Sequence, residues 1–332
     1  MEGDSAVEPQ GTDMHSILLK FKNFFPKNDT SAGLDIGTHS VKAVKLKFNQ
    51  NEAELQGFNI TAVGQSLPQA LKASASALSV TSANISLSGP SVIIRYAEFP
   101  RMQAVELKQS LKFEAPKHIP FSVNEVNLDA HILKPSLADN KMLVLLAAVK
   151  KDFMNQRIKA IQDAGIRVAF VDIDSLALVN AFNYNYAKEQ ESLKHRALAL
   201  LNIGNSMTNL NIIEDKLPYL SRDIPIGANN FKQEDKGTTG ASDALFSNLA
   251  AQIRTSFDYY ESQSASTLAK IFLSGAGSLS AGLKEALAGI LRIEVEYWDP
   301  LKKIKIDKKI ESQGLKERSG QLAVAIGLAL RR

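Results

Sequence analysis

The 332-residue chain contains no cysteine, which excludes disulfide bonds and cysteine-ligated metal sites and fits a reducing compartment. No apolar run approaches the ~18 residues of a membrane-spanning helix. The acidic amino terminus has no leader of basic and then apolar residues, so we do not expect export. The net charge is only +4 and no basic stripe is interleaved with aromatic residues, so we expect no nucleic-acid partner.

The length allows two domains, each with its own core. Residues 1–30 form a tail with two parts. We expect the polar first part, residues 1–13, to be disordered, and the second part, residues 14–25, is apolar with nearby cations. The second part could be a short amphipathic segment that lies on a membrane surface. The alternative is a helix packed on the domain, or an ordinary tail. The latter is favoured, because a marginal anchor needs a second signal.

The stretch at residues 33–46 predicts a strand, a tight polar turn and a second strand. Glycine at the turn leaves room for a ligand to approach the backbone, and turn N–H groups and hydroxyls can face an anion, usually phosphate. A carboxylate at the strand end can organise a metal ion beside the phosphates. A plain hairpin with a polar tip is the alternative. The residues concerned are Asp35, Gly37, Thr38, His39, Ser40 and Lys42.

The pattern returns in the second half of the chain. Residues 200–213 again predict a strand, a glycine turn with hydroxyls and a strand, and residues 271–279 predict a strand, a small-residue turn and a helix start. Two similar hairpins predict two related lobes that close on one ligand. The polar and glycine residues concerned are Asn202, Gly204, Asn205, Ser206 and Thr208, followed by Gly275, Ala276, Gly277 and Ser278.

Other segments give simpler expectations. Residues 67–77 and 152–164 predict helices, and residues 243–261 have helical apolar spacing. The small-residue helix at 321–330 could pack tightly where the lobes join. Asp172 and Asp174 could serve a metal or nucleotide, although capping and turn formation are favoured. The basic run at residues 302–309 is interpreted as a solvated face.

These motifs resemble the actin/Hsp70/sugar-kinase superfamily and, within it, the PilM family, which comprises FtsA-like cytoplasmic proteins of the type IV pilus inner-membrane platform. The first turn is shared across the superfamily, and the Ile119-Pro120-Phe121 segment followed by residues 172–178 narrows the resemblance. The matching segments are residues 35–42, 118–126, 147–151, 164–166, 171–178, 224–227 and 323–330.

The resemblance implies an α/β, actin-like (ribonuclease H-like) two-lobed ATPase fold with an FtsA-type insert called 1C. The first lobe (1A) would comprise residues 31–100 and 151–195, and the insert residues 101–150. The second lobe would comprise residues 196–332, with subdomain 2A and a reduced 2B at about 228–270. The reduction is expected because residues 232–242 resemble a polar loop where relatives have a helix.

The resemblance also implies that ATP or ADP binds with Mg²⁺ between the lobes. The implied nucleotide residues are those of the three turns together with Gly227, and Asp35 is the implied metal ligand. Most relatives have aspartate where this chain has Asn202, and an amide can hydrogen-bond but cannot act as a base. We therefore expect no turnover or a very weak ATPase, and assign no catalytic residue.

The implied partner is the cytoplasmic N-terminal peptide of PilN, held in a groove of the 1A/1C region, with further contacts to pilus platform and motor proteins involved in twitching motility. The protein would then be cytoplasmic and peripheral to the inner membrane, with homo-oligomerisation left open. Groove residues cannot be assigned from sequence, since Phe113, Ile119 and Phe121 suit the core or a contact surface equally.

Four alternatives to a non-hydrolysing adaptor remain. An active ATPase needs a group that positions water, which Asn202 disfavours. An FtsA-like or MreB-like filament former is possible, but the membrane-targeting helix of FtsA is expected to be missing, since the sequence stops at Arg332. A nucleotide-free scaffold would explain the eroded segments. A sugar or acid kinase is disfavoured, since that class is usually longer and needs a substrate-side aspartate.

Overall fold

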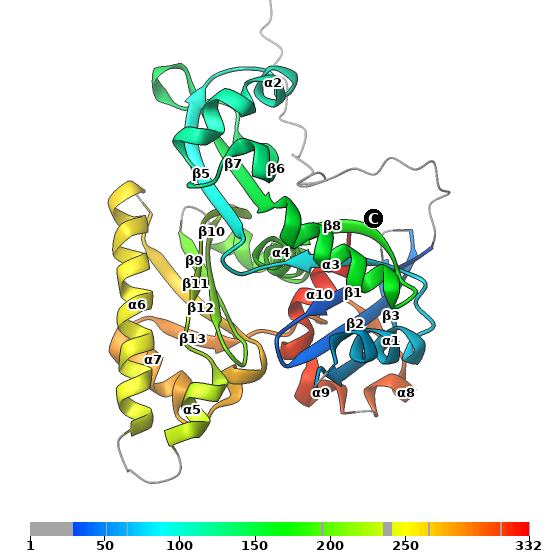
Figure 1. The fold of residues 1–332 in the computed structure, drawn as a ribbon. Helices are drawn as coiled ribbons and strands as arrows, with labels where there is room; N and C mark the ends of the chain where they lie inside the picture. Colours follow the sequence, from blue (N-terminus) through cyan, green and yellow to red (C-terminus); the bar gives the residue numbers. More distant parts are fainter. Residues whose placement is uncertain are drawn as a thin grey trace, which may run out of the picture.

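Two β-sheets, one in each lobe, organise the chain, with a small inserted module above them (Figure 1). A computed structural model describes residues 29–50, 52–64, 66–193, 196–234, 241–264, 266–312 and 314–331. The expected tail at residues 1–28 lies outside the described residues.

The first sheet has six strands, in the spatial order β14-β3-β2-β1-β4-β8. Strands β1, β2 and β3 pair antiparallel, while β4, β8 and β14 join in parallel. Helix α1 (Leu67–Ala77) covers this sheet and starts at Ser66, whose hydroxyl accepts the N–H of Gln69. The strands are β1 (Thr30–Ile36), β2 (Ser40–Asn49), β3 (Glu52–Ala62), β4 (Ser82–Leu87), β8 (Arg167–Ile173) and β14 (Lys305–Ile306).

The second sheet has five strands in the order β11-β10-β9-β12-β13. Strands β11, β10 and β9 pair antiparallel, whereas β12 is parallel to β9 and β13 is parallel to β12. The strands β3-β2-β1-β4-β8 of the first sheet have the same order and directions. This repetition gives the two related lobes that the paired hairpins predict. The strands are β9 (Ala197–Ile203), β10 (Thr208–Glu214), β11 (Leu217–Ile224), β12 (Leu268–Ser274) and β13 (Glu294–Tyr297). Helices α5 (Ala228–Glu234), α6 (Ala241–Gln263) and α7 (Leu283–Leu291) belong to this lobe.

The insert between β4 and β8 has its own three-stranded sheet, in the order β5-β7-β6. Because β5 pairs with β7 in this sheet, the insert begins before residue 101, where the sequence expectation placed its start. Helix α2 packs on this sheet and buries Leu107 and Leu111 in a separate apolar core. Helix α3 then leads back to the first lobe and is followed by Gly165 at φ +83°. The elements are β5 (Val92–Pro100), α2 (Ala104–Glu114), β6 (Val126–Lys134), β7 (Lys141–Lys150) and α3 (Lys151–Asp163).

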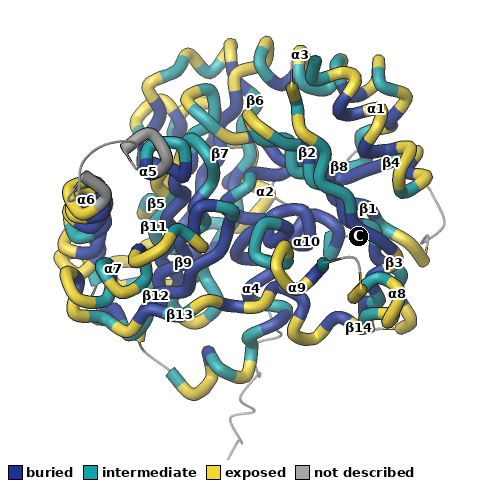
Figure 2. The backbone as a smooth tube through the Cα atoms, turned by 90° about the horizontal axis from the view of Figure 1, so that it is seen from below, coloured by how far each residue is buried: buried dark blue, intermediate teal, exposed yellow. Residues whose placement is uncertain are grey.

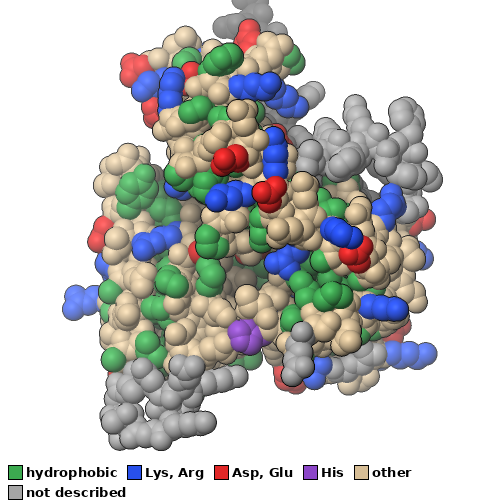
Figure 3. Space-filling model, viewed as in Figure 1, with side chains coloured by type: hydrophobic (Ala, Val, Ile, Leu, Met, Phe, Trp, Pro, Cys, Tyr) green, Lys and Arg blue, Asp and Glu red, His purple; other side chains and the backbone are tan. Residues whose placement is uncertain are grey.

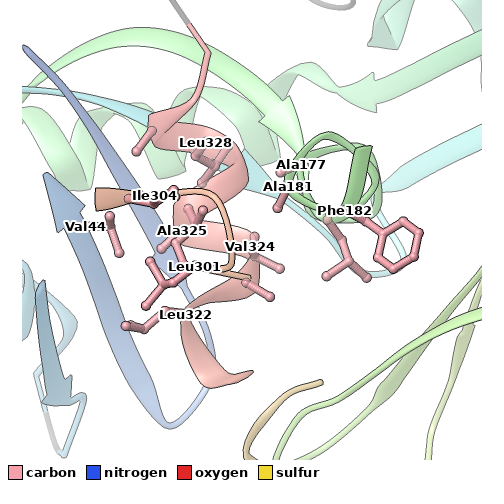
Figure 4. Packing of buried hydrophobic residues seen from close by; sticks show 14 of the residues in the cluster. Val44, Ala177, Ala181, Phe182, Leu301, Ile304, Leu322, Val324, Ala325 and Leu328 are labelled. Carbon is pink, nitrogen blue, oxygen red and sulfur yellow. The ribbon is translucent and has the colours of Figure 1, made fainter. Parts of the chain in front are cut away.

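Helices α4 (Asp174–Ser192) and α10 (Ala323–Ala329) lie between the sheets, where the most deeply buried residues gather (Figure 2). One apolar cluster joins residues of β2 and β3, both helices, and β9, β10 and β12 of the second lobe. Figure 4 shows Val324 and Ala325 of α10 among Val44 of β2 and Phe182 of α4. The small-residue helix therefore packs at the junction of the lobes, as its sequence predicts.

Two glycines allow this close packing. A Cβ atom on Gly327 would lie 1.8 Å from the carbonyl oxygen of Ala177 in α4. One on Gly33 of β1 would lie 2.0 Å from the carbonyl oxygen of Ala325. Because the opposing atoms belong to the backbone, neither contact could relax by a side-chain rotation.

The chain after β13 differs from the sequence expectation, which carried the second lobe to residue 332. Strand β14 pairs with β3 of the first sheet, through Lys305 opposite Glu54, and α8 (Lys308–Glu311) also contacts β3. Helix α9 (Leu315–Arg318) follows before α10. Helix α5 continues to Glu234, three residues into the expected loop, and residues 235–240 lie outside the described part of the chain.

Candidate functional site

The β1–β2 and β9–β10 hairpins close with the same turn. The N–H of Gly37 donates to the carbonyl oxygen of Ser40 at 3.0 Å, and that of Gly204 donates to Met207 at 2.8 Å. A Cβ atom would approach the same carbonyl oxygens, at 3.1 Å from Ser40 and 3.0 Å from Met207. Glycine at both positions therefore keeps the turns tight.

The two turns meet across the lobe interface. The hydroxyl oxygens of Thr38 and Ser206 lie 3.2 Å apart. His39 contacts Thr38 through Nδ1 at 2.9 Å, and its Nε2 lies 2.8 Å from the amide nitrogen of Asn229. Since the Asn229 amide nitrogen can only donate, Nε2 accepts and Nδ1 carries the proton that points at Thr38. Opposite halves of the sequence thus form one polar surface.

The third turn and Gly227 pack against the second turn. A Cβ on Gly275, whose φ is +89°, would lie 2.3 Å from the carbonyl oxygen of Ile203. One on Gly277 would lie 2.6 Å from the Ile203 side chain, and one on Gly227 would lie 2.6 Å from the carbonyl oxygen of Asn205. These glycines are needed for backbone packing, whatever else they contact. Ala276, between the two glycines of the third turn, is partly buried.

Two of the predicted hydroxyls are turned into the protein. Thr208 is fully buried and donates to the carbonyl oxygen of Ile226 at 2.7 Å. Ser278 is buried and donates to Gly275 at 2.8 Å. Both hydroxyls therefore bind backbone carbonyl oxygens inside the protein and stabilise the turns, whereas the sequence predicted that they contact the ligand. Ser40, partly buried at the start of β2, belongs to the first turn itself.

The first turn carries an ion pair and the second carries neutral amides at the matching positions. Lys42 and Asp35 face each other across β1 and β2, and Nζ lies 2.8 Å from Oδ2. The Lys42 ammonium also lies 3.6 Å from the Cβ position of Gly37, which places the cation behind the turn. In the second lobe Asn202 faces Asn209 instead, and the Ser274 hydroxyl lies 3.3 Å from Oδ1 of Asn202.

A family model described as "Type IV pilus assembly protein PilM" matches residues 33–240 and 243–332. The chain belongs to the PilM family. The solved structure described as "PilM-PilN type IV pilus biogenesis complex" has 23% sequence identity and a TM-score of 0.79, covering 92% of this chain and 99% of that one. The ethanolamine utilization protein EutJ from Carboxydothermus hydrogenoformans has 12% identity and a TM-score of 0.50, covering 93% and 92%. The fold is the two-lobed actin-like fold expected from the sequence.

Near the turns of this PilM-family chain lies a carboxyl group that the sequence assigned to capping. Asp174, the first residue of α4, accepts the N–H of Ser175 at 2.7 Å. Burial, together with the nearby carboxylates of Asp223 and Asp35, raises the pKa of Asp174 to about 8. The raised pKa favours the protonated form of the Asp174 carboxyl.

Sequence reasoning missed this grouping because its members are far apart in the chain. Asp223 of β11 accepts from Asn209 at 2.8 Å, and only the sheet register places it beside α4. Asn229 lies two residues after Gly227. Its polar side chain, close to a predicted site residue, was the signal in the sequence that could have indicated its contact with His39. Asp172, by contrast, is buried in an ion pair with Arg331, a role distinct from both metal binding and capping.

The structure distinguishes Phe113, Ile119 and Phe121 of the insert, which the sequence could not assign to the core or to a contact surface. Ile119 is buried in the insert core, whereas Phe113 is 78% exposed. Phe121 is partly buried, with the Lys150 ammonium 4.7 Å from its ring centroid. No helix in the described part of the chain is long and apolar enough to cross a membrane.

Proposed function

We propose that this chain is a cytoplasmic adaptor of the type IV pilus assembly platform, peripheral to the inner membrane. It binds ATP or ADP with Mg²⁺ between its lobes and the N-terminal cytoplasmic peptide of PilN through the first lobe and the insert. The observation that carries the nucleotide part is the meeting of two equivalent turns, with Thr38 and Ser206 3.2 Å apart.

The donors at this place suit a chain of phosphates. The turns present hydroxyls and backbone N–H groups, and Lys42 lies behind the first glycine. No group of three or more His, Cys, Asp or Glu side chains among the described residues could hold a metal ion. That fits Mg²⁺, which usually binds through one or two carboxylates, phosphate oxygens and water. Asp35 would supply the carboxylate once Lys42 pairs with a phosphate.

Calorimetric titration of the full chain with MgATP tests nucleotide binding. A ligand at a hundredfold its Kd stabilises the folded state by about 2.7 kcal/mol, so the melting temperature should also rise. Ser206→Asp places a negative charge where phosphate would lie and should abolish both signals. Ser262→Asp, at an exposed position of α6, is the matched control and should leave both unchanged. Absence of heat and stabilisation with the parent chain would remove the nucleotide.

We expect nucleotide binding without ATP hydrolysis, because neither Asn202 nor Asp174 suits the role of a general base. Asn202 cannot act as a base, and Asp174 holds its proton up to about pH 8, since burial raises its pKa. A phosphate-release assay should therefore give at most a very slow rate. A rate typical of enzymes, about 1 s⁻¹ or above, would establish the alternative of an active ATPase.

A nucleotide-free scaffold is the second candidate, and a specific observation favours it. The groups that would meet phosphate and metal already satisfy one another, through the Thr38–Ser206 and His39–Asn229 contacts and the Lys42–Asp35 ion pair. The calorimetric titration separates the two candidates directly.

The peptide part of the proposal is supported by family membership and by an open sheet edge. Strand β8 is the last strand of the first sheet and pairs only with β4 among the described strands. An extended peptide can add to such an edge through main-chain hydrogen bonds. Hydrogen exchange of the full chain with the PilN peptide should show new protection in residues 167–173. Protection confined to the second lobe would contradict this location.

A further inference from the structure

Helix α2 has one buried and one exposed apolar side. Leu107 and Leu111 face the core of the insert. On the outside, Val105 is 68% exposed and Phe113 is 78% exposed, more than any other large apolar side chain in the described part of the chain. Single exposed apolar residues are ordinary, but two on one helix face suggest an interaction surface.

Two cations lie beside Val105 on the exposed side of the helix. At about 100° per residue, Lys112 lies about 20° and Lys108 about 60° to one side of Val105, and Phe113 lies about 80° to the other side. Both lysines are exposed, and neither makes an ion pair within the part of the chain that the structure describes. We call Val105, Lys108, Lys112 and Phe113 the α2 outer face.

The acidic residues of α2 are already engaged. Glu106 accepts the backbone N–H of Gln103 at 2.7 Å, and Glu114 pairs with Lys117 at 2.8 Å. Neither of these carboxylates pairs with Lys108 or Lys112. The helix lies at the end of the insert farthest from the lobes (Figure 1), where Figure 3 shows cationic and apolar side chains side by side.

We propose that the α2 outer face contacts the surface of an anionic membrane. A helix with lysines beside an exposed aromatic ring suits the lipid headgroup region, where each lysine strengthens binding about fivefold. The cores of protein–protein interfaces are instead depleted of lysine, and here two lysines share the exposed side of the helix with the apolar side chains. A contact of this size gives weak, reversible binding by itself, which a second attachment would strengthen. The proposed PilN peptide would provide one, so this inference extends the proposed function.

Vesicle co-sedimentation of the full chain tests the contact without nucleotide or peptide, so the two proposals can fail separately. Phosphatidylcholine vesicles containing phosphatidylglycerol should bind the chain, salt should weaken the binding, and phosphatidylcholine alone should not bind. The double variant Lys108→Glu/Lys112→Glu should lose at least about 25-fold in affinity. The double variant Lys308→Glu/Lys309→Glu reverses two exposed lysines on α8 and should bind as the parent does.

A second readout does not depend on charge reversal. The chain has one tryptophan, Trp298, which is buried. In Phe113→Trp the new indole should shift its emission to shorter wavelength on binding anionic vesicles. The proposal is overturned if anionic vesicles do not bind the parent chain, if binding survives Lys108→Glu/Lys112→Glu, or if the new indole stays in water while the chain is bound. Binding through the amino-terminal residues would give the second result.

Discussion

The contact between α10 and α4 gives the sharpest prediction for stability. In Gly327→Ala the new Cβ would lie 1.8 Å from the carbonyl oxygen of Ala177 and 2.5 Å from its carbonyl carbon. The helices must separate by about 1.5 Å to reach the ~3.3 Å of a close carbon–oxygen contact. Overpacking of a core costs about 1–3 kcal/mol, and the upper end applies because both opposing atoms are backbone. The better helix propensity of alanine returns about 1 kcal/mol.

The net expectation for Gly327→Ala is a loss of about 2 kcal/mol, or about 3 °C in melting temperature for a chain of 332 residues. Scanning calorimetry measures both. Gly289→Ala is the matched control, since Gly289 lies inside α7 with nothing within 4 Å of its Cβ position. That variant should gain about 0.5–1 kcal/mol. If Gly327→Ala behaves like Gly289→Ala, the account of the close helix crossing is refuted.

Two further predictions concern the carboxyl groups of Asp174, which is partly buried, and Asp172, which is buried. The folded-state pKa of Asp174, about 8, exceeds the ordinary value of 3.8, so the folded state holds this proton more tightly and its stability falls as pH rises from 4 to 8. Asp174→Asn should therefore have a higher melting temperature than the parent chain at pH 8 and the same melting temperature at pH 4. If variant and parent melt at the same temperature at both pH values, the raised pKa of Asp174 is contradicted. Arg331→Met leaves Asp172 buried without its ion pair and should cost about 3 kcal/mol in denaturant unfolding at pH 7. Burial already raises the pKa of Asp172, so the loss should shrink as the pH is lowered and the carboxyl takes up a proton. Lys159→Ala, which breaks an exposed ion pair on α3, is the control and should cost under about 0.5 kcal/mol.

The local features of the fold could be predicted from the sequence. The turn at Gly37 has its own composition and spacing, and the helix at residues 67–77 has a proline start and small-residue pattern that need no distant partner. The small residues of α10 also predicted tight packing, because few other sequences let helix backbones approach so closely.

The features that depend on distant residues could not be predicted. Strand β14 has two residues, too few for any alternation, and pairs with β3 some 250 positions earlier. The His39–Asn229 contact and the Asp174–Asp223 proximity depend on how the lobes close, for which neither segment carries a local signal. The hydroxyls of Thr208 and Ser278 matched a binding pattern in sequence, but their rotamers point inward.

The position of α10 also has a consequence for the order of events during synthesis. The serine hydroxyl at the start of β1 donates to the carbonyl oxygen of Arg331, 300 positions later, and the Gly33 backbone stays uncovered until α10 exists. Ribosomes add about 5–20 residues per second, so roughly 15 to 60 s separate the two. For that time the nascent first sheet lacks the helix that covers it, which makes it a natural substrate for chaperones.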